Sequence, residues 1–166
     1  MKLMSITLIS FFSMAAIMLA NTGHANNLER AKTFFDQLNK DQLHLVDQFY
    51  DSQVVFQDPI HTLNGASALK KYYEGLYRNV DEIRFVYGPS IEQGNTVSLT
   101  WRMHLQTPAL QSGKELTVDG VSVITFGGTE NKAIHHRDYF DMGEFVYERV
   151  PVLSSIITYI KKRMAN

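Results

Sequence analysis

The feature that most limits how this chain can fold is the stretch from Ile83 to Asp141, which contains strand patterns and no helical one. Apolar and polar residues alternate in EIRFVYG and TVSLTWRMHLQ, and ELTVDGVSVITF is long and rich in β-branched residues. GGTEN supplies a turn into the last segment of this kind, KAIHHRDYFD. We therefore predict a series of antiparallel strands over this whole stretch.

The residues before Ile83 have helical periodicity instead, interrupted by one short strand, SQVVFQ. We predict three helices with apolar faces: one capped by Asn26 or Asn27, one from Leu43 to Tyr50, and one in GASALKKYYEGLYRNV. Helices followed by antiparallel strands predict an α+β fold with the helices on one face of the sheet. A strongly curved sheet would wrap over these N-terminal helices as a cone with an apolar interior.

Composition excludes several classes of function. The 166 residues are 45% hydrophobic and 20% charged, which is typical of one soluble globular domain. The formal net charge of -1 gives no reason to expect nucleic acid as a partner. The absence of cysteine excludes disulfides, thiol catalysis and zinc–thiolate sites.

The first 25 residues have the pattern of a secretory signal peptide. One lysine, Lys2, precedes an apolar stretch from Ile6 to Ala20, and the small residues Gly23 and Ala25 follow. The apolar stretch is shorter than the roughly 20 residues that a membrane span needs, which argues against a retained anchor. We predict cleavage near Ala25 and a periplasmic or secreted protein. The predicted organisation is a signal peptide (1–25), one domain (26–145) and a C-terminal amphipathic helix (146–166).

The C-terminal segment is predicted to be helical from Glu144 to Arg163, with an interruption at Pro151. Its apolar residues form a broad face, and three basic residues, Lys161, Lys162 and Arg163, follow at its end. The helix could cover the open mouth of the cone or the sheet edge, which is the more common role of such a face. Peripheral contact with a membrane is the alternative.

Several quoted stretches resemble the nuclear transport factor 2-like superfamily, specifically its SnoaL-like and ketosteroid-isomerase-like members. NKDQLHLVDQFYDSQVVFQDP is similar to the isomerase segment that carries the general base, and NGASALKKYY is similar to the glycine-led third helix. KAIHHRDYFD resembles the last strand of SnoaL-like proteins. The resemblance runs from about Leu28 to Asp141 and implies a cystatin-like α+β barrel. Because this fold hosts isomerases, cyclases, epoxide hydrolases and binding modules, it does not name a function.

Asp58 lies in FQDPIHTLNG, where Asp-Pro is ordinary turn chemistry. The resemblance places Asp58 at the position of the isomerase general base, facing apolar walls that would raise its pKa. The same comparison places Phe34 and Ser122 where the isomerase has its two hydrogen-bond donors to the enolate. Phe34 cannot donate and Ser122 is a weaker donor than a carboxylic acid, so steroid isomerisation is not expected.

Strand alternation in HHRDYFD places His136, Asp138 and Phe140 on one face. The resemblance implies that this face looks into the cavity, with Asp138 near the acid–base aspartate of SnoaL-like cyclases. His136 and Asp138 could instead form an ion pair that serves only the sheet or a dimer contact. His61 could reach the rim of the cavity, although a solvent-exposed loop histidine is the more common case.

Trp101 alternates with Arg102 and is predicted to line the pocket or core, together with Met103. Four residues, Asp58, His61, His136 and Asp138, could in principle bind a metal, but their spacing is not diagnostic and no metal or cofactor is predicted. We thus predict Asp58, Asp138 and His136 as catalytic candidates and Phe34, His61, Trp101, Ser122 and Phe140 as ligand-binding candidates.

Three functions remain open at this point. The first is cofactor-free acid–base chemistry on a small apolar carbonyl or ring compound, by an isomerase or cyclase. The second is a non-catalytic carrier of a lipid-like or aromatic ligand, and the third is a structural dimer that uses its sheet face. The partners predicted are a small hydrophobic molecule and a second copy of the chain. Whether Asp58 and Asp138 share one cavity distinguishes the first two functions.

Overall fold

The computed structural model describes residues 26–108, 113–145 and 151–164. The predicted signal peptide (1–25) and residues 146–150, which are part of the predicted C-terminal helical segment, lie outside the described residues. The helices are α1 (Asn27–Gln37), α2 (Leu45–Phe49), α3 (Ala66–Tyr77), α4 (Met142–Phe145) and α5 (Pro151–Met164). The strands are β1 (Tyr50–Gln57), β2 (Thr62–Asn64), β3 (Glu82–Tyr87), β4 (Ile91–Gln93), β5 (Thr96–Gln106), β6 (Leu116–Gly127) and β7 (Lys132–Phe140).

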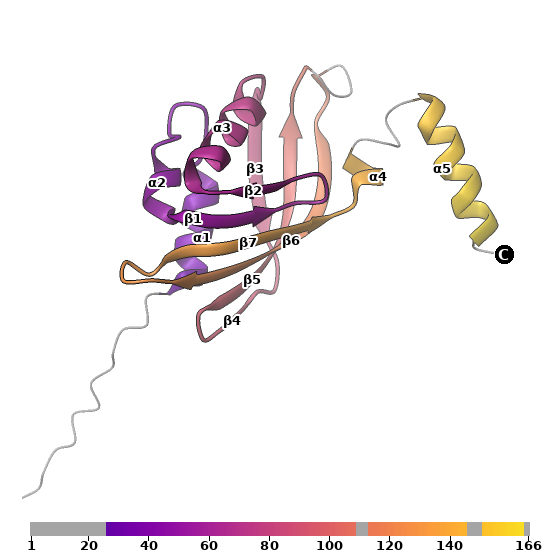
Figure 1. Ribbon diagram of the computed structural model, residues 1–166. Helices are drawn as coiled ribbons and strands as arrows, with labels where there is room; N and C mark the ends of the chain where they lie inside the picture. Colours follow the sequence, from indigo (N-terminus) through magenta and orange to yellow (C-terminus); the bar gives the residue numbers. More distant parts are fainter. Residues whose placement is uncertain (1–25, 109–112, 146–150, 165–166) are drawn as a thin grey trace, which may run out of the picture.

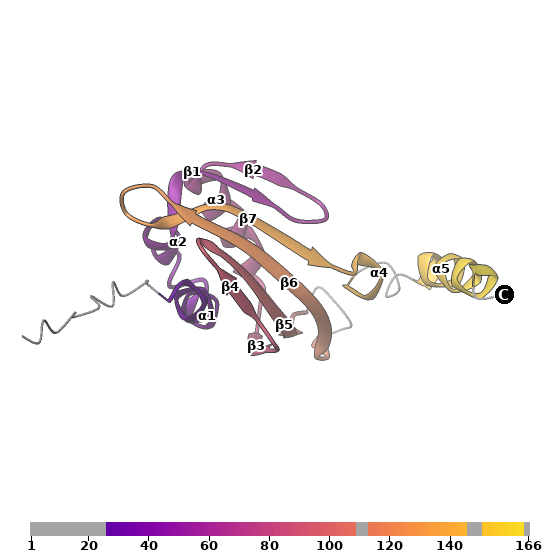
Figure 2. The ribbon, with the colours of Figure 1, turned by 90° about the horizontal axis from the view of Figure 1, so that it is seen from below.

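One mixed sheet forms the body of the molecule, with the strand order β2-β1-β7-β6-β5-β3 and β4 paired to β5. All pairs are antiparallel except β1 with β7, which run parallel. The sheet curls around the side on which α1, α2 and α3 lie (Figures 1 and 2). The predicted α+β fold, a curved sheet wrapped over N-terminal helices, is therefore confirmed.

Helices α1, α2 and α3 bury one face each against the concave side of the sheet. The Asn26 side chain accepts a hydrogen bond from the Glu29 amide, so it caps α1 as predicted. Ahead of α3, Gly65 has a φ of 87°, and a Cβ there would lie 3.2 Å from the Ser52 carbonyl oxygen. Glycine therefore lets the chain turn tightly from β2 into α3.

One boundary differs from the prediction. Tyr50 was expected at the end of the second helix, but it begins β1, because its amide closes α2 on the Val46 carbonyl and its backbone is then extended. The described part of α5 begins at Pro151, and because residues 146–150 lie outside the described residues, the interruption of a helix at Pro151 stays a prediction. Proline suits a first helical turn because no hydrogen bond from its nitrogen is needed there.

In both views α5 stands clear of the sheet (Figures 1 and 2). No helix among the described residues is both long enough and apolar enough to cross a membrane. Covering the mouth of the cone and contacting a membrane both stay predictions for this helix.

Candidate functional site

A cavity of about 150 Å³ lies between α3 and the concave face of the sheet. This volume is comparable to that of a cavity that holds a benzene-sized molecule. Most of the lining is apolar and comes from α1, α3, α4 and strands β1, β3, β5 and β7. The polar lining residues are Asp58, Tyr72, Tyr73, Tyr77, Ser122 and Asp138.

Asp138 enters the cavity from the last strand, β7. Ser122 lies directly opposite it on β6, so the Ser122 hydroxyl donates a hydrogen bond of 2.5 Å to Asp138 Oδ1. His136 Nε2 lies 2.8 Å from the same oxygen. His136 and Ser122 are buried and Asp138 and Phe140 are partly buried, so the predicted inward orientation of this strand face is confirmed.

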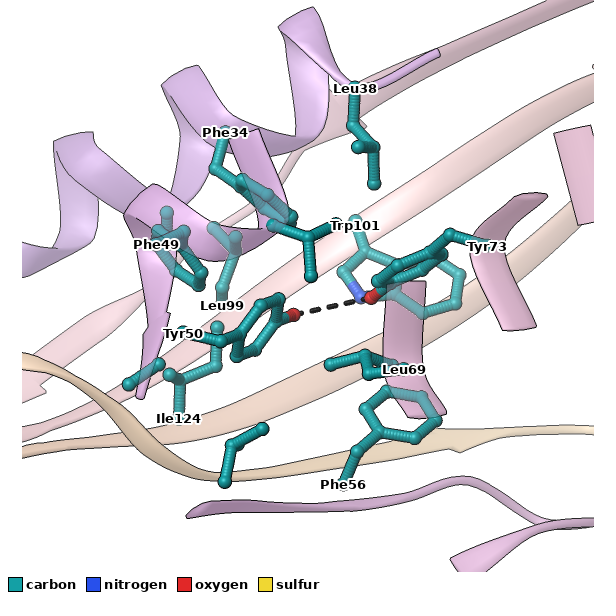
Figure 3. Packing of buried hydrophobic residues seen from close by; sticks show 14 of the residues in the cluster. Phe34, Leu38, Phe49, Tyr50, Phe56, Leu69, Tyr73, Leu99, Trp101 and Ile124 are labelled. Atoms are coloured by element: carbon teal, nitrogen blue, oxygen red, sulfur yellow. Dashed lines mark hydrogen bonds between the residues drawn. The ribbon is translucent and has the colours of Figure 1, made fainter. Parts of the chain in front are cut away.

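His136 is fully buried behind Asp138 and does not line the cavity. Its Nδ1 lies 2.7 Å from the Tyr50 hydroxyl, which lies 3.2 Å from the Tyr73 hydroxyl (Figure 3). Burial raises the pKa of both tyrosines, so both hydroxyls stay protonated.

The hydrogen-bond network assigns the tautomer of His136. The Asp138 carboxylate can only accept, so Nε2 donates to it, and Nδ1 of a neutral imidazole then accepts from Tyr50. The Tyr50 hydroxyl in turn accepts from Tyr73. This chain of hydrogen bonds therefore runs from α3 through the core to Asp138.

Trp101 completes the surroundings of Asp138 from β5. Its indole Nε1 donates a hydrogen bond of 2.9 Å to Ser122 Oγ. The indole ring lies over Gly120, where a Cβ would come within 2.3 Å of the ring. Within the described part of the chain, both hydrogen bonds of Asp138 go to Oδ1, and Oδ2 accepts none.

Asp58 follows β1 and is 7% exposed. Its Oδ1 accepts hydrogen bonds from the amides of Ile60 (2.7 Å) and His61 (2.6 Å), and its Oδ2 accepts one of 2.5 Å from the Tyr72 hydroxyl. Burial raises the pKa of Asp58, but these hydrogen bonds together lower it further, so the pKa lies below its ordinary value. The expected rise in pKa is therefore wrong.

The structure brings five of the predicted residues to one cavity: Asp58, Trp101, Ser122, Asp138 and Phe140. The two carboxylates, Asp58 and Asp138, therefore line the same cavity. The other three predicted residues, Phe34, His61 and His136, do not line it. No group of histidines and carboxylates among the described residues could hold a metal ion.

Phe34 and His61 have other surroundings than expected. Phe34 stacks on Phe49 in the core, with ring centroids 4.2 Å apart, while the next residue, Phe35, lines the cavity. His61 is exposed, and its Nδ1 lies 3.5 Å from Asp58 Oδ1. A ligand role for either residue has no support from the cavity lining.

Sequence reasoning missed the tyrosines of the site. Tyr72, Tyr73 and Tyr77 on α3 line the cavity, and Tyr50 on β1 supports His136. The predicted third helix, GASALKKYYEGLYRNV, was given only an apolar face, with no role for its tyrosine hydroxyls. Three tyrosines within two turns of one amphipathic helix were the available signal, because buried hydroxyls need hydrogen-bond partners.

Comparisons with known proteins agree with the fold. The family model of the SnoaL-like domain matches residues 31–136. A search of curated proteins finds no sequence that matches significantly.

Solved structures share the fold. A nuclear transport factor 2-like protein of unknown function from Burkholderia pseudomallei is 17% identical, with a TM-score of 0.64 over 76% of this chain and 98% of that one. A SnoaL-like protein from Shewanella denitrificans, assigned as a polyketide cyclase, is 18% identical, with a TM-score of 0.62 over 70% and 91%. TerC, crystallised with polyporic acid, is 20% identical, with a TM-score of 0.60 over 72% and 94%.

Proposed function

The chain belongs to the SnoaL-like domain family, and from this premise we propose that it binds a small, largely apolar carbonyl or ring compound and moves a proton on it without a cofactor. The reaction would be an isomerisation or a cyclisation. Neighbouring structures that include an assigned polyketide cyclase are compatible with this class of chemistry.

The observation that carries the proposal is the asymmetry of the Asp138 carboxylate. Oδ1 is held by His136 and Ser122, while Oδ2 has no hydrogen bond from a described residue and the carboxyl group lines a mostly apolar cavity. A carboxylate oxygen left free in such surroundings is suited to accept a proton from a ligand. His136 acts as a positioning residue, since it contacts Asp138 and not the cavity.

The proposed step begins when Asp138 Oδ2 removes a proton from a carbon next to a ligand carbonyl. The electrons of the C–H bond form a carbon–carbon double bond, and negative charge develops on the carbonyl oxygen. Where the ligand has a carbon–carbon double bond one carbon further on, the carboxyl group then returns the proton to the far carbon of that bond as the double bond moves next to the carbonyl, which is an isomerisation. In a cyclisation the carbanion instead attacks a second carbonyl carbon of the same ligand, the π electrons of that carbonyl move to its oxygen, and this oxygen takes the proton from the Asp138 carboxyl group.

Asp58 is not part of this proposed step. Three donors occupy its two oxygens, and its pKa is lowered, so it is a weak base at neutral pH. The same observation favours the alternative, a non-catalytic carrier. With Asp58 excluded, Asp138 is the only carboxylate of the described cavity with a free oxygen, so no second carboxylate remains to share acid–base work.

Nitrobenzisoxazole tests the proposal without knowledge of the natural ligand, because a base that removes its ring C–H proton opens it to a coloured nitrophenolate. Wild type should open it faster than an equal concentration of acetate. Asp138→Asn should lose roughly 10²-fold of this rate, the usual scale for a positioned base. Asp58→Asn is the matched control and should lose much less. An Asp138→Asn variant that is folded and as fast as wild type would leave only the carrier.

A further inference from the structure

Three tyrosines of α3 reach the cavity, and the protein itself engages the hydroxyls of two of them. Tyr72 donates to Asp58 Oδ2, and the Tyr73 hydroxyl lies 3.2 Å from that of Tyr50. The Tyr77 hydroxyl makes no hydrogen bond to any residue that the structure describes, although Tyr77 is only 6% exposed.

The Tyr77 hydroxyl is not enclosed by protein. Every fully enclosed polar side-chain atom among the described residues has a hydrogen-bond partner, so the oxygen of Tyr77 must reach open space. Tyr77 lines the cavity, and we take the cavity to be the space that its hydroxyl reaches. Burial raises the pKa of Tyr77, which keeps the hydroxyl protonated and able to donate.

The other hydrogen-bond donors around the cavity are occupied. Trp101 Nε1 donates to Ser122, and Ser122 donates to Asp138. Tyr72 and Tyr73 donate within the protein as described above. Among the described polar side chains of the lining, Tyr77 is thus the one that can offer a proton to a ligand.

We propose that the Tyr77 hydroxyl is the hydrogen-bond donor for the ligand, which therefore carries an acceptor oxygen, such as a carbonyl, on an otherwise apolar ring frame. This inference rests on the proposed function, because it takes the cavity to be the ligand site. A phenylalanine would fill the same volume, and the Tyr77 hydroxyl makes no hydrogen bond to a described residue that would stabilise the fold, so the hydroxyl serves the bound state.

In the proposed reaction the oxygen that accepts from Tyr77 is the oxygen that becomes negative. Asp138 takes the C–H proton, the electron pair moves toward this oxygen, and the Tyr77 O–H bond remains intact. A donor aimed at developing charge stabilises the transition state more than the ground state. The predicted specificity is therefore for ketones and related carbonyl compounds over hydrocarbons of the same shape.

Acetophenone and α-methylstyrene test this, because they differ only in C=O against C=CH₂. Dissociation constants from NMR titration should show that wild type prefers acetophenone. Tyr77→Phe should weaken acetophenone binding about threefold to tenfold, the range for one neutral hydrogen bond, and leave α-methylstyrene binding unchanged. The thermal midpoint of Tyr77→Phe should be equal to or above that of wild type.

Tyr73→Phe is the matched control, on the same helix and the same cavity. It should lower the thermal midpoint, because its hydroxyl bonds to Tyr50, and leave the preference for acetophenone intact. Equal effects of Tyr77→Phe on both probes, or no effect on either, would overturn the role of Tyr77 while the ligand cavity stands. Failure of wild type to bind either probe would overturn the ligand cavity as well.

Discussion

Replacing Asp58 distinguishes between two roles: a carboxylate that only accepts hydrogen bonds in a turn, and a base with a raised pKa. Asp58→Ala removes the acceptor of the amides of Ile60 and His61 and of the Tyr72 hydroxyl. The two amides lie in an exposed turn and can bind water, so their loss is that of a capping residue, about 1 kcal/mol. The partly buried Tyr72 hydroxyl adds about 1–2 kcal/mol. We expect Asp58→Ala to lower the free energy of unfolding by about 2–3 kcal/mol in total.

Asp58→Asn keeps an oxygen for both amides and loses only the charge and its bond to Tyr72, so we expect a loss of about 1 kcal/mol. The pKa of Asp58 is lowered in the folded state, so its charge stabilises the fold above the unfolded pKa of about 3.9. This stabilisation is lost as the pH falls through the folded pKa. The difference between wild type and Asp58→Asn should therefore be full near about pH 7 and shrink near about pH 3.

Urea unfolding followed by tryptophan fluorescence measures these differences, because Trp101 is the only tryptophan and lines the cavity. A poised base with a raised pKa would give the opposite result at neutral pH, since its charge would destabilise the fold. An Asp58→Asn variant at least as stable as wild type at about pH 7 would therefore refute the reasoning.

Two further predictions concern the supports of Asp138. Gly120→Ala would place a methyl group against the Trp101 ring. The resulting overpacking should lower the free energy of unfolding by about 1–3 kcal/mol and shift the tryptophan emission. Unchanged emission would contradict the packing of the ring over Gly120. Tyr50→Phe leaves the buried Nδ1 of His136 without its hydrogen-bond donor. It should lower the free energy of unfolding, measured in urea, by about 1–3 kcal/mol and slow the opening of nitrobenzisoxazole. An unchanged rate of opening would remove His136 from the support of the base.

Much of the fold could be predicted from local pattern. The periods of α3 and of β5 to β7 are regular, and alternation in β7 correctly placed His136 and Asp138 inside. β2 was missed because three residues are too few to show alternation. On α1, two adjacent phenylalanines both fit the apolar face, so the sequence could not decide that Phe35 rather than Phe34 reaches the cavity.

The chemistry of the site depends on contacts between distant residues, which periodicity does not reveal. Burial of Asp58, which raises its pKa, was predicted, but not the hydrogen bonds from Tyr72 on the next helix and from the turn that follows Asp58, which together lower the pKa below its ordinary value. The bond between Tyr50 and His136 joins residues 86 positions apart. Local patterns therefore predicted which side chains face inward, but not which hydroxyl bonds to which partner.

Because β1 pairs in parallel with β7, the last strand joins the two parts of the sheet. β7 lies between β1, from the helical half of the chain, and β6, from the antiparallel half, so neither half is joined through the sheet until residues 132–140 are in place. Asp138 lies on that strand. During synthesis the cavity wall and the proposed base are thus completed in a single late event, and contacts of such long sequence separation form slowly. A peptide of this one strand, added to a chain that ends before it, would restore the cavity wall and Asp138 together.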